Sequence, residues 1–153
     1  MTDIPTLVHL PERFTALIPV SAPQADIREV MGAGIGELLG ALAAQHISPT
    51  GPWFTRHLHR PAAQWDFEIS IPVPGPMTPA GRVVNGRWPA MHAARTVYHG
   101  AYEGLGDAWE NLLAWIEAQG LQTSADLWEC YAVGPDSTHD PAQWRTELIQ
   151  PLR

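Results

Sequence analysis

The sequence predicts an α+β fold in which a βαββ unit occurs twice and builds a largely antiparallel sheet with two helices on one face. Three observations indicate it. Two segments, 24–45 and 105–116, carry apolar residues at steps of three and four, as amphipathic helices do. Short apolar or alternating runs, bounded by proline and glycine, flank each helical segment. Related motifs also recur in the two halves of the chain, which indicates an internal repeat.

The first half is expected to run strand, helix, strand, strand. Its elements are, in order, 13–20 (RFTALIPV), 24–45, 53–60 (WFTRHLHR) and 65–73 (WDFEISIPV). The helix contains Gly32, Gly34, Gly36 and Gly40, but they do not follow a strand with G-x-G-x-x-G spacing. These glycines therefore predict close packing of the helix on the sheet rather than a phosphate-binding loop.

The second half is expected to repeat this order after a loop rich in proline and glycine at 74–81. Its elements are 91–99 (MHAARTVYH), the helical stripe at 105–116, 127–133 (LWECYAV) and 144–152 (WRTELIQPL). Gly120 is a natural helix stop. We therefore expect a single domain, 1–153, with pseudo-repeats at about 12–73 and 88–152.

The last strand of each half carries the pattern W-x-x-E-[IL]-x-x-P, at Trp65–Pro72 and at Trp144–Pro151. The tryptophan and the glutamate are three residues apart, so a regular strand directs them to opposite faces. The tryptophans are expected to pack against the helices. The pattern is thus chiefly a marker of duplication.

Composition excludes several classes of function. The 153 residues carry a net charge of −7, with 9 basic and 16 acidic residues, and no cluster of basic residues suits a nucleic-acid surface. One cysteine, Cys130, allows no intrachain disulfide, and the sequence has neither a signal-peptide pattern nor a membrane span. We expect a soluble cytoplasmic protein with no direct nucleic-acid or membrane binding.

Glutamates on the strands are the candidate chemical groups. Alternation places Glu68, Glu129 and Glu147 on the sheet face that the helices leave uncovered. Glu68 and Glu147 are also explained as surface charges or as partners of arginine. Glu129 differs because aromatic residues flank it, so it is suited to hold a cation or accept a proton.

The other polar candidates are weaker. His57 and His59 share a strand face, but no third ligand for zinc lies nearby, so both are expected at the surface. Cys130 and Trp109 are expected in the core. The sequence predicts no metal site and no cofactor.

Five segments together resemble the GyrI-like small-molecule-binding domain, which also serves as the effector-binding domain of AraC- and MerR-type regulators. They are Gly51–Phe54 (GPWF), Asp66–Val73 (DFEISIPV), Tyr98–Ile116 (YHGAYEGLGDAWENLLAWI), Trp128–Pro135 (WECYAVGP) and Asp140–Leu152 (DPAQWRTELIQPL). The resemblance implies paired βαββ units with a ligand groove between them, on the side away from the helices. Because the chain begins almost at the first strand, it resembles a stand-alone member.

The resemblance also implies a site. A glutamate on an F-E-x-Y strand meets flat cations inside an aromatic cage in drug-binding members, and Glu129 with Tyr131 matches that strand. The expected ligand-binding residues are Glu129, Tyr131, Trp53, Phe54, Trp88, His99, Tyr102, Trp144 and Glu147. Strand parity places Trp144 on the helix side, away from the expected groove.

Two main functions are open. One is a binding protein that sequesters or senses flat hydrophobic or cationic xenobiotics. The other, implied by a related subfamily, is a hydrolase of cyclopropane-bearing DNA-alkylating toxins, with Glu129 as catalytic base and Tyr131 or His99 as acid. A third interpretation is a protein partner, such as a DNA-processing enzyme that meets the acidic surface.

Overall fold

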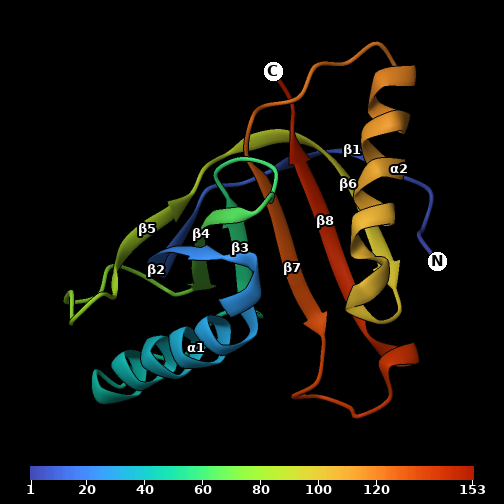
Figure 1. Ribbon diagram of the computed structural model, residues 1–153. Coiled ribbons are helices and arrows are strands. Elements are labelled where there is room, and N and C mark those ends of the chain that lie inside the picture. The colour runs from blue at the N-terminus through green and yellow to red at the C-terminus, as the bar shows by residue number, and fades with distance from the viewer.

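The computed structural model describes the whole chain, residues 1–153, as one curled antiparallel sheet, a half-barrel, with two long helices (Figure 1). The strands are β1 (Thr6–Leu10), β2 (Arg13–Pro23), β3 (Phe54–His57), β4 (Gln64–Pro72), β5 (Val84–Trp88), β6 (Met91–His99), β7 (Leu127–Val133) and β8 (Arg145–Pro151). The helices are α1 (Ile27–Ala44) and α2 (Leu105–Ala118).

The strand order is β1-β6-β8-β7-β3-β4-β2-β5, and every pairing is antiparallel. The two units, β2-α1-β3-β4 and β6-α2-β7-β8, meet where β3 pairs with β7. The predicted fold class is therefore confirmed. Strands β1 and β5 were not expected, and each adds to one edge of the sheet.

Each helix packs its apolar stripe on the strands of its own βαββ unit. In α1, Gly34 lies so close to β4 that an added Cβ would come 2.5 Å from Ile69 Cδ1, whereas Gly32, Gly36 and Gly40 meet nothing within 4 Å. Close packing on the sheet thus explains one of the four glycines. Helix α2 ends just before Gly120, whose φ of +73° favours glycine.

Three apolar clusters show which face the helices cover. The first joins Leu38 and Leu42 of α1 to strand residues that include Phe67 and Ile69, and the second joins Leu112 and Ile116 of α2 to Leu127 and Leu148. Ile69 is paired with Thr55, Thr55 with Glu129, and Glu129 with Leu148. Directly paired residues project to the same face, so both helices cover one face, the helix face.

The opposite side, the helix-free face, has a core of its own. Its members are Phe54, Trp88, Ala93, Trp128, Cys130 and Ile149, with Val8, Leu10 and Met91 packed against them. Trp88 comes from one edge strand and Val8 from the other. The sheet therefore curls around this third cluster. As a result, both faces of the central strands β3 and β7 are buried.

Candidate functional site

The candidate site lies on the helix face, where the two units meet. Strand β3 contributes Thr55 and His57, and β7 contributes Glu129 and Tyr131. In the register of these strands, Thr55 lies directly opposite Glu129. Figure 1 shows α1 and α2 over different halves of the sheet, with β3 and β7 at its centre. The polar side chains therefore lie between the two helix-packed cores.

Glu129 is a buried carboxylate, only 8% exposed. The indole of Trp109, on α2, donates to its Oε2 at 3.2 Å, and the Tyr131 hydroxyl donates to its Oε1 at 3.3 Å. His57 Nε2 lies 3.5 Å from the same Oε1. A buried carboxylate needs such donors because burial removes it from water. No arginine forms an ion pair with it, and the chain contains no lysine.

Thr55 connects the remaining polar groups. Its Oγ1 lies 2.9 Å from the Tyr131 hydroxyl and 3.3 Å from His57 Nε2. His57 is 2% exposed, and its ring stacks on Phe67 with 5.4 Å between centroids. The expectation that His57 lies at the surface is wrong, because both faces of β3 are covered by packed side chains.

Aromatic rings surround the outer side of this network. Trp53 stacks on Tyr131 with 4.2 Å between centroids, and Tyr102 meets Tyr131 edge-on at 5.9 Å. Trp144 packs on Tyr102 at 4.9 Å. Four of the sequence-predicted aromatic residues thus form one cluster beside Glu129. Trp144 joins it because the site is on the helix face.

Both tyrosines beside Glu129 remain protonated at neutral pH. Burial first, and then the charge of Glu129, raises the pKa of Tyr131 well above its ordinary value. Burial, with the charges of Asp136 and Glu129, raises the pKa of Tyr102 to about 12. Tyr131 therefore serves the carboxylate as a hydrogen-bond donor.

The prediction that Glu129 shares a face with Glu68 and Glu147 is wrong. Glu147 is paired with Cys130, the neighbour of Glu129, so it projects to the helix-free face. There Glu147 pairs with Arg95, and Glu68 pairs with Arg56. The expected groove on the side away from the helices therefore does not contain Glu129.

Three other expected ligand-binding residues also lie away from Glu129. Phe54 and Trp88 are each 1% exposed and pack on Trp128 in the core of the helix-free face. His99 pairs with Asp3 at 2.9 Å, at the end of β6. Its neighbour Tyr98 packs in the α2 core, so alternation directs His99 to the opposite face.

Two members of the candidate site, Thr55 and His57, and the contact of Trp109 with Glu129 were not predicted from the sequence. Thr55 and His57 alternate on β3 with Phe54 and Arg56, and this two-residue period was the available signal. Trp109 lies in the core as expected, at 7% exposure, but its N–H also reaches Glu129. Helical periodicity identifies a buried face but not the polar edge of a tryptophan on it.

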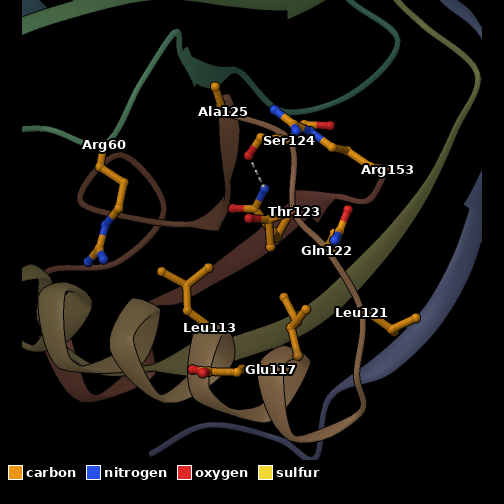
Figure 2. Close-up of a pocket in the computed structure, with 11 residues that line it drawn as sticks. Arg60, Leu113, Glu117, Leu121, Gln122, Thr123, Ser124, Ala125 and Arg153 are labelled. Carbon is orange, nitrogen blue, oxygen red and sulfur yellow. Dashed lines mark hydrogen bonds between the residues drawn. The ribbon is translucent and has the colours of Figure 1, made fainter.

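A separate surface pocket of about 580 Å³ lies beside the C-terminal half of α2 (Figure 2). Leu113, Ile116 and Glu117 of α2 line one side, and the segment 121–125 lines another. Arg60, from the β3–β4 connection, lies across from them. None of the sequence-predicted site residues lines this pocket.

No group of three or more His, Cys, Asp or Glu side chains is placed to hold a metal ion. No helix is both long and apolar enough to cross a membrane.

Comparison with solved structures identifies relatives of the fold. The chain resembles the C-terminal domain of EcmrR, with a TM-score of 0.87 and 22% identity, over 98% of this chain and 97% of that one. In an EcmrR–DNA complex, with the same TM-score and identity, it spans 57% of the EcmrR chain. At these identities the likeness is one of fold.

Two more distant structures have named properties. A hydrolase from Listeria innocua matches with a TM-score of 0.71 and 12% identity, over 97% of this chain and 91% of that one. SAV2435 bound to tetraphenylphosphonium matches with a TM-score of 0.65 and 12% identity, over 99% and 94%. No curated protein sequence matches the chain. The model of the GyrI-like small molecule binding domain matches residues 5–153, so the chain belongs to this family.

Proposed function

We propose that this domain binds flat hydrophobic or cationic small molecules at Glu129, and thereby sequesters or senses them. One observation carries the proposal: a carboxylate that is 8% exposed, has no arginine partner and lies between two apolar cores. A buried charge without a permanently charged partner is costly, and a cationic ligand would supply one. The family assignment makes a small molecule the natural partner.

The aromatic cluster supports the rest of the proposal. The rings of Trp53 and Tyr102 pack on Tyr131, which donates to Glu129, and the ring of Trp144 packs on Tyr102. Such rings attract cations through their π faces and bind flat molecules by stacking. Tetraphenylphosphonium, an aromatic cation, is the ligand of the structural neighbour SAV2435.

Burial sets a condition on binding. Because Glu129 is buried, a ligand reaches its carboxylate only when side chains around it shift. Trp53, which precedes β3, and Trp144, which precedes β8, both belong to connecting segments. Connecting segments move at lower cost than paired strands, so these two rings are expected to move first.

Titration with a flat aromatic cation tests the proposal. Tryptophan fluorescence of the protein is followed while 9-aminoacridine is added, with tetramethylammonium chloride as a matched cation that has no ring. We expect saturable quenching by the aromatic cation alone. Linear, non-saturating quenching, or equal effects of both cations, would contradict the proposal.

A second candidate function is hydrolysis of cyclopropane-bearing DNA-alkylating compounds. The pairing of Glu129 with a protonated Tyr131 at 3.3 Å favours it, because a carboxylate base can orient water while the phenol donates to a developing oxyanion. The structural neighbour from Listeria innocua is a hydrolase. His99, on the other face, has no part in this mechanism.

Mass spectrometry separates the two functions. The protein and its Glu129→Gln variant are incubated with a cyclopropane-bearing alkylator, and the ring-opened product is counted per protein molecule. Many turnovers that disappear in the variant would establish the hydrolase. Stoichiometric binding without product would leave the binding function alone.

A further inference from the structure

The hydrogen atoms of the polar network can be assigned by counting donors. An ionised carboxylate only accepts, so the single hydroxyl hydrogen of Tyr131 goes to Glu129. The Tyr131 oxygen, 2.9 Å from Thr55 Oγ1, then accepts from the threonine hydroxyl. Thr55 in turn accepts from the remaining neighbour, His57 Nε2, at 3.3 Å. Each group therefore donates to the next in one direction, from His57 to Thr55, from Thr55 to Tyr131 and from Tyr131 to Glu129.

This direction requires a hydrogen on His57 Nε2. With its hydrogen on Nε2, a neutral His57 carries a lone pair on Nδ1. That Nδ1 is buried, and no protein group forms a hydrogen bond with it. A buried polar atom without a partner is costly, so it is expected to be used by something the site binds.

The carboxylate has the same unused capacity. Glu129 accepts two hydrogen bonds, from Trp109 and Tyr131, although an ionised carboxylate offers about four acceptor positions. Each hydrogen-bond donor inside the network is therefore already used by an acceptor of the same network. What His57 and Glu129 leave unused are acceptors.

We propose that the ligand of this site is a planar aromatic cation that carries N–H donors, such as an amidinium or aminoacridinium, rather than a quaternary onium ion. One N–H donates to Glu129 and another to His57 Nδ1, while the ring stacks in the cluster of Trp53 and Tyr131. The inference rests on the proposed function and adds the chemical class of the ligand. Thr55 is its positioning residue, because it holds the histidine in the required tautomer.

A fully alkylated cation compensates the charge of Glu129 but donates no hydrogen bond to Glu129 or to His57 Nδ1. It would place methyl groups against two buried lone pairs and leave them without donors. A site built around hydrogen bonds discriminates strongly against an analogue that lacks them. We therefore expect the fully methylated cation to bind at least about 10-fold more weakly, which corresponds to about 1.4 kcal/mol.

The test compares two cations of equal charge and similar ring shape. Affinities for 9-aminoacridine, which carries N–H donors, and for 9-(dimethylamino)-10-methylacridinium, which carries none, are measured by calorimetry with the wild-type chain. The same pair is then measured with His57→Phe, which keeps an aromatic ring beside Phe67, and with Thr55→Val. The control is His59→Phe, whose ring lies at the surface and pairs with Asp66.

The expected result is a preference of at least about 10-fold for 9-aminoacridine in the wild type and in the His59 control, reduced to near unity in both network variants. Equal affinities in the wild type, with both lost in Glu129→Gln, would overturn the donor requirement and leave the proposed function intact. Saturable binding of neither cation would overturn both. The comparison in the wild type does not depend on whether a variant folds.

Discussion

The two faces of the central strands β3 and β7 bury their side chains in different ways. On the helix-free face, Phe54 and Trp128 pack with Trp88 into an apolar core, and the glutamates there pair with arginines nearer the surface. On the helix face, Thr55 and Glu129 are also buried, but they bond to other polar groups. One face is therefore an apolar core, and the other carries the polar groups that we propose bind the ligand.

Removing a ring from the apolar face should give the largest loss of stability. Trp88 is 1% exposed and packs on Phe54 and Trp128 at 4.9 and 4.4 Å between centroids. Trp88→Ala should lower the free energy of unfolding by about 3–5 kcal/mol, as large-to-small core substitutions do. Urea unfolding measures the change. A loss below about 1 kcal/mol would show that this face is not a packed core.

The polar face should give an intermediate effect. Tyr131→Phe keeps the ring against Trp53 but removes the hydroxyl that joins Thr55 to Glu129. The variant should lose about 1–3 kcal/mol of unfolding free energy, because buried partners are left unsatisfied. Thr55→Val is measured alongside. The double variant should lose less unfolding free energy than the sum of the two single variants, since both changes break one network. Strict additivity would contradict the network.

Alkaline pH should weaken the same face. The pKa values of Tyr102, about 12, and of Tyr131 are raised in the folded chain. The unfolded chain therefore loses these phenolic protons first, near pH 10, and the folded state holds more protons between pH 10 and 12. The free energy of unfolding should fall across that window. A urea midpoint that stays constant from pH 9 to 11.5 would contradict the burial of these hydroxyls.

The smallest effect is expected from the ion pairs of the helix-free face. Arg95 and Glu147 are about one third exposed, at 34% and 29% of their side chains. Exposed ion pairs contribute about 0–1 kcal/mol, so Arg95→Gln should change the unfolding free energy by less than about 1 kcal/mol. A larger loss would mean that this pair also supports the apolar core beneath it.

The fold was accessible from the sequence because its signals are local and repeated. The stripe that ends near Ile116 and the duplicated W-x-x-E pattern specify helices and strands without knowledge of tertiary contacts. Strand β7 has the predicted bounds, Leu127–Val133. Edge strand β5 was missed because it is short and carries Gly86 at its centre, which weakens a strand signal.

The face of the site was not accessible, for a physical reason. On β7 the consecutive residues Leu127, Trp128, Glu129 and Cys130 are all buried. Alternation identifies faces only when one side meets water, and here the curled sheet buries both. Trp53, Tyr102, Tyr131 and Trp144 do cluster beside Glu129, but on the helix face rather than on the face that alternation predicted. His57 was missed because its burial follows from its pairing opposite Leu127 on β7, a tertiary contact that the local sequence does not show.

One measurement tests the contrast between the faces most directly. Glu129 and Glu147 lie on neighbouring strands but face opposite sides of the sheet. The affinity for 9-aminoacridine should fall at least about 30-fold in Glu129→Gln, since a buried charge contact is lost, and change less than about 2-fold in Glu147→Gln. Equal losses in both variants, or a larger loss in Glu147→Gln, would contradict the placement of the site on the helix face.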